Sequence, residues 1–130
     1  MTTKPKAKAS HVGAPAIFNL ELACKHLNAA FADGFGCYLV GSALERPDWR
    51  DVDVRLILRD EAFAALFPDV VGITWEFDPR WIVMTAGISA WLSQQTGLPV
   101  DFQFQPQTHA NERHKGTRSA LGLTIAREKP

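Results

Sequence analysis

The sequence predicts one domain of the α/β (α+β) class, with a small β-sheet flanked by helices. Two segments have apolar residues at intervals of three and four, the period of an amphipathic helix: residues 15–34 and 78–97. Three short apolar runs rich in strand-forming residues predict strands: residues 35–40, 52–58 and 100–105. A chain of 130 residues that is 46% hydrophobic and 22% charged has enough apolar side chains for one core.

The N-terminal region divides into a tail and a first helix. Residues 1–14 carry three lysines among small and polar residues, and we expect a flexible basic tail there. Apolar periodicity begins at Pro15, a residue suited to the first turn of a helix, and Gly34 is suited to its end. The folded domain is therefore expected over residues 15–113.

The middle of the chain alternates strands with short helical segments. A turn ends the first strand and precedes one helical turn at residues 43–46. After the second strand, residues 60–65 predict a short helix capped by Asp60. Residues 69–77 have no clear period and predict a loop.

The last third begins with the strongest helix signal of the chain. Asp78-Pro79 is typical of a helix start and Gly97 of a helix end, so we expect a buried helix between them. The third strand alternates apolar and polar residues, which places one of its faces in the core. Residues 107–113 predict a helical turn. The C-terminal segment 114–130 fits either a short packed segment or a frayed end.

The composition excludes a strong overall attraction to nucleic acid or to an anionic membrane. The formal net charge is zero, from 14 basic and 14 acidic residues, so any phosphate binding must be local. The sequence opens without the apolar run of a signal peptide, and no apolar segment is long enough to span a membrane. Cys24 and Cys37 lack CxxC spacing, so we expect a reduced, cytoplasmic protein.

Two acidic residues flank Val52 at the start of the second strand. Successive side chains of a strand point to opposite faces, so Asp51 and Asp53 share one face. Two ionised carboxylates at this spacing repel each other, and a divalent metal ion would relieve the repulsion. The alternative interpretation is a solvated edge strand.

A third carboxylate lies on the expected third strand. Asp101, Gln103 and Gln105 share one face of this strand. If the second and third strands are neighbours, Asp101 joins Asp51 and Asp53 in an all-oxygen site suited to Mg²⁺. Taken alone, Asp101 is more typical of a surface acid than of a metal ligand.

The turn after the first strand has features that favour phosphate binding. Gly41 permits close approach of the backbone, and Ser42 offers a hydroxyl group. The helical turn that follows begins with free amide N–H groups, which can donate hydrogen bonds to phosphate oxygens. Most Gly-Ser pairs are nevertheless simple turns, so the dipeptide alone indicates little.

Three arginines lie near the predicted acidic site. Arg55 shares the face of the acids, and Arg46 and Arg50 belong to the loop before them. Each suits a bidentate contact with phosphate oxygens. Arg55 fits a salt bridge with Asp53 or Asp101 equally well.

Histidines and tryptophans are weaker candidates. His109 and His114 are five residues apart, which does not suit a metal pair on one helical face, so a solvated polar end is expected there. Trp75 could stack on a base, whereas Trp81 and Trp91 fall on the apolar face of the long helix and are expected in the core.

Three motifs occur in order along the chain. They are Leu39-Val40-Gly41-Ser42, then, after a spacer of eight residues, Asp51-Val52-Asp53-Val54, and later Val100-Asp101-Phe102. This combination resembles the nucleotidyltransferase superfamily that includes DNA polymerase beta. The pattern of that family is an apolar residue, Gly, Gly or Ser, a spacer, and alternating acids and apolar residues, with a third acid on a later strand. The resemblance covers residues 35–104.

The resemblance implies a nucleotidyltransferase-like mixed sheet flanked by helices, as a minimal stand-alone catalytic core. Asp51, Asp53 and Asp101 would hold two Mg²⁺ ions, or Mn²⁺, while Gly41 and Ser42 would position a nucleoside triphosphate such as ATP. The implied reaction transfers a nucleoside monophosphate to an acceptor hydroxyl and releases pyrophosphate. Asp101 would lie nearest the acceptor, which is a protein, an RNA or a small molecule, and a partner protein could complete the site.

Two other functions remain open at this point. A non-catalytic nucleotide-binding or partner-binding module, regulatory or antitoxin-like, can have the same fold. The three acids favour catalysis, whereas Leu44-Glu45-Arg46, which replaces a basic residue and glycine found in many family members, favours the binding module. A third possibility is a metal-dependent phosphohydrolase that uses the same carboxylates on water.

Overall fold

The computed structural model describes residues 10–72 and 74–123, and these form an α+β fold built on one mixed sheet. Its four strands are β1 (Gly34–Val40), β2 (Val52–Leu58), β3 (Val100–Pro106) and β4 (Ser119–Leu121). They lie in the order β3-β2-β1-β4. β1 is antiparallel to both β2 and β4, whereas β2 and β3 are parallel. The predicted fold class, a small mixed sheet with flanking helices, is confirmed.

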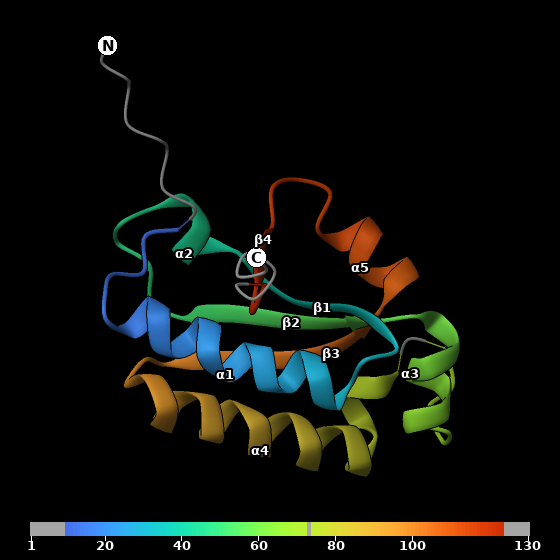
Figure 1. Ribbon diagram of the computed structural model, residues 1–130. Helices are drawn as coiled ribbons and strands as arrows, with labels where there is room; N and C mark the ends of the chain where they lie inside the picture. Colours follow the sequence, from blue (N-terminus) through green and yellow to red (C-terminus); the bar gives the residue numbers. More distant parts are fainter. Residues whose placement is uncertain (1–9, 73, 124–130) are drawn as a thin grey trace, which may run out of the picture.

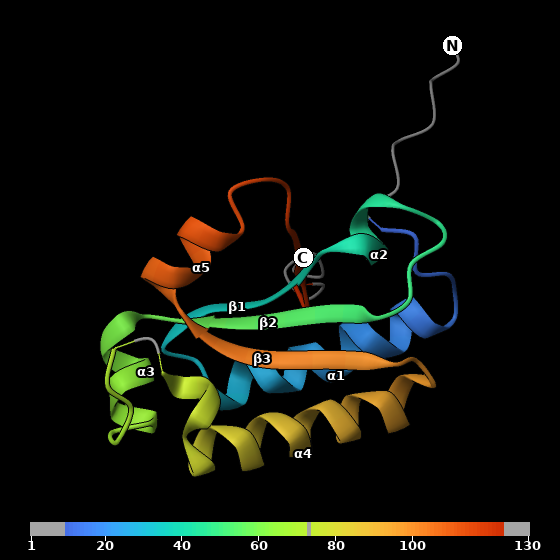
Figure 2. The same cartoon turned by 180° about the vertical axis from the view of Figure 1, so that it is seen from behind.

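Helices cover the two faces of the sheet unequally. The described residues contain α1 (Ala16–Ala30), α2 (Ser42–Glu45), α3 (Asp60–Leu66), α4 (Pro79–Thr96) and α5 (Gln107–Arg113), with a 3₁₀ turn, η1 (Trp75–Phe77), before α4. Figures 1 and 2 show α1 and α4 side by side along one face, with α2 and α5 on the opposite side. The face of the sheet on the side of α2 and α5 is here called the open face, because these short helices cover only part of it.

The hydrophobic core lies between the sheet and the two long helices. Alternate residues of β2 and β3 point into it and are fully buried: Val52, Val54, Leu56, Phe102 and Phe104. The intervening residues therefore point to the open face. This alternation, which the sequence predicts for both strands, separates the apolar core from the polar face on which the predicted site residues lie.

The long helix α4 begins and ends at the predicted residues. The Asp78 carboxylate accepts a hydrogen bond from the Trp81 amide at 2.9 Å, and Gly97 adopts the left-handed conformation that ends many helices. The expectation of a buried helix is wrong for its outer side. Ile82 and Val83 are 44% and 69% exposed, because only one side of the helix packs on the sheet.

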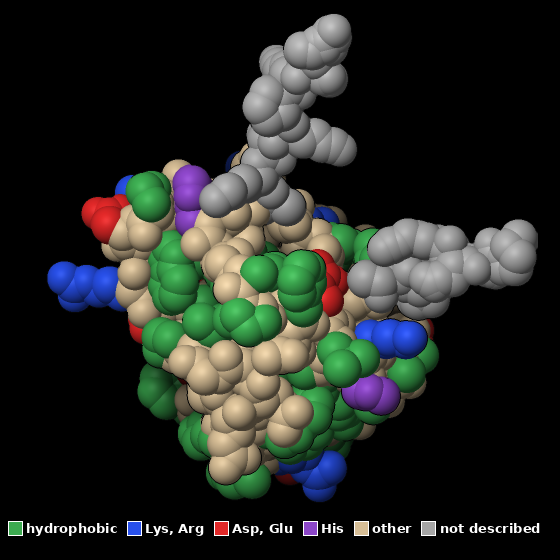
Figure 3. Space-filling view, turned by 60° about the vertical axis from the view of Figure 1, so that its left-hand side comes forward, with side chains coloured by type: hydrophobic (Ala, Val, Ile, Leu, Met, Phe, Trp, Pro, Cys, Tyr) green, Lys and Arg blue, Asp and Glu red, His purple; other side chains and the backbone are tan. Residues whose placement is uncertain are grey.

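The outer side of α1 also carries exposed apolar residues, among them Phe18 and Leu22. Figure 3 shows hydrophobic side chains dispersed over one side of the molecule, with charged groups mainly toward the edges of the view. No helix among the described residues combines the length and the apolar character needed to cross a membrane.

The sequence predicts that Asp60 caps α3, and this prediction is wrong. Arg59 is the cap residue, and Asp60 is the first residue of the helix. The Asp60 carboxylate instead accepts hydrogen bonds from the amide and hydroxyl groups of Thr108 in α5, and these bonds lower the pKa of Asp60. Asp60 therefore ties α3 to α5. The predicted loop at residues 69–77 contains η1, and Ile73 lies outside the described residues.

Packed residues are found on both sides of the range 15–113. Residues 10–14 belong to the folded part, because Ser10 and Val12 are buried and the His11 amide donates to Ala43 O at 2.8 Å. Residues 1–9 and 124–130 lie outside the described residues. Within the C-terminal segment, β4 pairs with β1, so this part is a packed strand.

Asn28 joins the helical layer to two strands of the sheet. Its Oδ1 accepts a hydrogen bond from the Cys37 amide and its Nδ2 donates to Leu121 O, both at 2.9 Å. Gly122 has φ of 79°, and a Cβ at this position would lie 2.8 Å from Asn28 Nδ2. The glycine therefore permits the close contact between α1 and β4.

Replacing Asn28 with alanine should lower the free energy of unfolding by about 1–3 kcal/mol, because two backbone groups lose their partners. Urea denaturation of Asn28→Ala and of the control Asn19→Ala, an exposed asparagine on the same helix, measures the difference. Equal midpoints for the two variants would contradict the role given to Asn28.

Candidate functional site

Asp53 and Asp101 lie side by side on the open face. β2 and β3 are neighbouring parallel strands, and Asp53 pairs with Asp101 in their register. Asp51 lies just before β2 and is exposed. The structure thus brings two of the predicted acids together and places the third two residues before Asp53. Across residues 10–72 and 74–123, no group of three or more His, Cys, Asp or Glu side chains is arranged to hold a metal ion.

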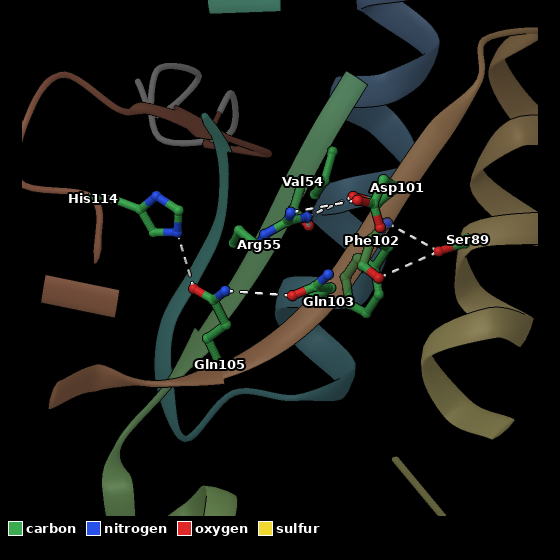
Figure 4. A network of polar contacts seen from close by, with 8 residues as sticks. All are labelled: Val54, Arg55, Ser89, Asp101, Phe102, Gln103, Gln105 and His114. Atoms are coloured by element: carbon green, nitrogen blue, oxygen red, sulfur yellow. Dashed lines mark hydrogen bonds and ion pairs between the residues drawn. The ribbon is translucent and has the colours of Figure 1, made fainter. Parts of the chain in front are cut away.

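Arg55 makes the salt bridge to Asp101, one of the two roles the sequence leaves open. Its Nη2 lies 3.5 Å from Asp101 Oδ2, and its Nη1 donates to Asp101 O at 2.7 Å and to Val54 O at 3.1 Å (Figure 4). The Arg55 side chain is only 10% exposed. Its Nε is buried and has no hydrogen-bond acceptor among the described residues.

The pKa of the Asp53 carboxyl group is raised above its usual value. Burial raises its pKa, the nearby Arg55 guanidinium lowers it, and the carboxylates of Asp101 and Asp51 raise it further. All three predicted acids therefore lie close enough to interact through their charges. A cation near Asp53 would relieve the repulsion among them.

The Gly41 turn lies directly against Asp53. Gly41 has φ of 79°, a conformation that favours glycine, and a Cβ at this position would collide with Asp53 Oδ2. Ser42 follows as the first residue of α2 and is half-buried. The turn thus has the predicted place beside the acids, and its geometry accounts for the glycine.

The structure does not bring two of the predicted arginines into the site. Arg46 forms an exposed ion pair with Asp48 at 3.2 Å, and Arg50 is exposed in the loop before β2. Neither side chain lines the cavity described next.

A cavity of about 330 Å³ occupies the open face between the Gly41 turn and α5. Its lining is mostly polar and comes from β2, β3, the end of β1, η1, α5 and the residues beside them: Val40, Gly41, Asp53, Arg55, Trp75, Glu76, Gln103, Gln105, His109, Arg113 and His114. Only three of the predicted site residues belong to this lining, namely Gly41, Asp53 and Arg55.

Sequence reasoning missed a chain of polar contacts in this cavity. His114 Nε2 lies 3.1 Å from Gln105 Oε1, and Gln105 Nε2 donates to Gln103 Oε1 at 3.5 Å (Figure 4). Because an amide oxygen only accepts hydrogen bonds, Nε2 of His114 carries the proton. Gln103 and Gln105 share the face of Asp101 in the sequence pattern, and this was the available signal.

The two histidines are part of the cavity and not of a solvated end. Burial and, after it, the charges of Arg55 and Arg113 together lower the pKa of His114 to about 4. Burial followed by Arg113 also lowers the pKa of His109, whose ring packs edge-on against Trp75 with centroids 4.8 Å apart. Trp75 is itself buried.

The comparisons with known proteins give no match to this chain among family models, curated proteins or solved structures. The functional assignment therefore depends on the residues and geometry described above.

Gly41→Ala should destabilise the fold by more than about 1 kcal/mol, because the left-handed backbone disfavours alanine and the new Cβ meets the Asp53 carboxylate. Gly87→Ala is the matched control, since it lies in α4 with no atom near its Cβ position and should stabilise by about 0.5–1 kcal/mol. Thermal or urea unfolding compares them. Similar stability in the two variants would show that Gly41 does not need its observed conformation.

The low pKa of His114 predicts a loss of stability in acid. The unfolded chain takes up a proton on this residue near pH 6.5 and the folded chain only near about 4, so protonation of His114 favours the unfolded state. Its contribution is complete above pH 6.5 and is lost as the pH falls toward 4.

His114→Gln should therefore lose less stability than the wild type between pH 6.5 and 4. The exposed His26 on α1 provides the control variant His26→Gln. Urea unfolding at several pH values gives the slope of the free energy of unfolding against pH for each protein. A slope for His114→Gln as steep as that of the wild type would contradict the assignment.

Proposed function

We propose that the open face binds a nucleoside triphosphate with magnesium and transfers its nucleoside monophosphate to an acceptor hydroxyl. The observation that carries this proposal is the pairing of Asp53 with Asp101 in neighbouring parallel strands, with the Gly41 turn against the Asp53 carboxylate. Adjacent carboxylates beside a close-approaching backbone turn suit a phosphate chain that carries metal ions.

The carboxylates fit magnesium in chemistry and in charge. Asp51, Asp53 and Asp101 provide only oxygen donors, which Mg²⁺ prefers, and their mutual repulsion contributes to the raised pKa of Asp53. The contact between Arg55 Nη2 and the Asp101 carboxylate is long, at 3.5 Å, and the Asp101 side chain is 47% exposed. Asp101 therefore has room to turn toward a cation. When bound, magnesium would polarise the phosphoryl group and neutralise its charge.

The residues of this chain would then have separate tasks. Gly41 would let the triphosphate approach the backbone, and the hydroxyl of Ser42 would donate to a phosphate oxygen. The acceptor oxygen would attack the α-phosphorus and give its proton to Asp101, while the bond from the α-phosphorus to the bridging oxygen breaks and pyrophosphate leaves. Arg55 would hold the backbone of Asp101 in place through its hydrogen bond to the carbonyl oxygen.

The cellular setting that we propose is the cytoplasm. Cys24 and Cys37 are both buried, free thiols, which suits a reducing compartment. The acceptor that fits the proposal is a protein, an RNA or a small molecule with a free hydroxyl group.

A second candidate is a nucleotide-binding or partner-binding module without turnover. The ion pair between Arg55 and Asp101 favours it, because this contact engages a carboxylate that catalysis needs. So does the finding that the described residues contain no preformed group of three metal-ligating side chains. Only an activity measurement separates the two functions.

Asp53→Asn and Asp101→Asn should each lower pyrophosphate release by about a hundredfold or more. Asp101→Asn should still bind nucleoside triphosphate with magnesium, because Asp101 is assigned to the acceptor side, whereas Asp53→Asn should bind it weakly. Labelled nucleotides with candidate acceptors and titration calorimetry provide the two measurements. Asp69→Asn, an exposed acid in the loop before η1, is the control.

The wild type could bind nucleotide without releasing pyrophosphate, and Asp101→Asn could behave identically. This result would contradict the enzyme and support the binding module. Pyrophosphate or phosphate release without labelling of an acceptor would indicate a phosphohydrolase. Unfolding of Asp53→Asn in the absence of metal would indicate a structural role, because removal of a repelling charge should not destabilise the fold.

A further inference from the structure

Two arginines line the cavity near α5, and a third, Arg118, lies beside the lining residues without belonging to them. Arg55 from β2 and Arg113 from α5 line the cavity. Arg118 places its guanidinium 4.9 Å from the centre of the Tyr38 ring and donates to Asn111 Oδ1 of α5 at 3.1 Å. Because Tyr38 pairs with Arg55 across β1 and β2, the side chains of Arg118 and Arg55 lie on neighbouring positions of the open face.

Two of these guanidinium groups have unused hydrogen-bond donors. Arg55 Nε and Arg118 Nη1 are buried, and neither has an acceptor among the described residues. Arg55 lines the cavity, and its side chain is nine-tenths buried. A buried cationic group whose N–H donors are not all paired is costly, and the negative charge of an oxyanion in the cavity would offset part of this cost.

The surroundings of His114 indicate a positive potential at the same place. After burial, the next causes of its low pKa are the charges of Arg55 and Arg113, and Arg118 contributes in the same direction. The lining also contains two carboxylates, Asp53 and Glu76. Asp53 lies beside the Gly41 turn, so the cavity joins the proposed metal site to an arginine-rich end.

We propose that this arginine-rich end, formed by Arg55, Arg113 and Arg118, binds an oxyanion, a phosphate or carboxylate group, that belongs to the acceptor substrate. The volume of about 330 Å³ is at the small end of ligand sites, which suits one compact polar group. The oxyanion site stands on the cavity alone, whereas its assignment to the acceptor rests on the proposed nucleotidyl transfer. An acceptor anchored in this way would present its hydroxyl group toward Asp53 and Asp101.

Titration of the full chain with inorganic phosphate, in EDTA and at constant ionic strength, tests the site. The NMR resonances of the His109 and His114 imidazoles should shift saturably with phosphate and with acetate but not with added chloride. Arg113→Gln and Arg118→Gln should each weaken phosphate binding by at least about tenfold, the scale of one charge-assisted hydrogen bond. Arg80→Gln, an exposed arginine at the start of α4, should bind phosphate as the wild type does.

The absence of a saturable shift would overturn the oxyanion site, as would equal losses in Arg80→Gln and Arg113→Gln. Arg113 is exposed, so its substitution keeps the test valid if Arg118→Gln fails to fold. A second phosphate titration, with nucleoside triphosphate and magnesium present, shows whether the oxyanion site belongs to the acceptor or to the nucleotide. Simultaneous binding supports the acceptor, whereas competition shows that the site holds the nucleotide and overturns that assignment.

Failure of the proposed function has a different signature. If phosphate binds at this end but no acceptor is labelled, the oxyanion site stands and nucleotidyl transfer is wrong. If labelling occurs while phosphate leaves the imidazole resonances unchanged, nucleotidyl transfer stands and the oxyanion site is wrong.

Discussion

The parallel register between β2 and β3 is the constraint on which the candidate site depends. It places Asp53 beside Asp101, and a slip of one residue would turn Asp101 into the core and Phe102 onto the open face. Burial of Phe102 opposes such a slip. Ser89 of α4 also fixes the strand, because its hydroxyl contacts both the amide and the carbonyl of Phe102 (Figure 4).

Oppositely charged side chains lie close together on the open face and are partly buried. Arg55 holds Asp101 while leaving one N–H group unused, and Asp53 keeps a raised pKa in the same surroundings. Such arrangements are costly for stability alone, so they are typical of sites that bind charged ligands. Phosphate chemistry needs both kinds of group, since carboxylates hold cations and arginines contact oxygen atoms.

The sequence predicts the elements whose signals are local. The caps at Asp78 and Gly97 set the limits of α4, and period-two alternation identifies the polar faces of β2 and β3. The role of Arg55 was left open because its partner depends on how two distant strands pair. The histidines of the cavity were missed for the same reason: His114 reaches Gln105 only after α5 folds back over the sheet, and a pattern of spacings contains no such information.

The proposed function requires that one nucleotide binds between the Gly41 turn and the paired acids. A crystal structure of the protein with a non-hydrolysable nucleoside triphosphate analogue and Mn²⁺ tests it most directly, because anomalous scattering locates the metal ion. The account predicts metal within coordination distance of Asp53 and Asp101, and a triphosphate against Gly41 and Ser42. A nucleotide bound elsewhere, or metal density away from both carboxylates, would contradict it.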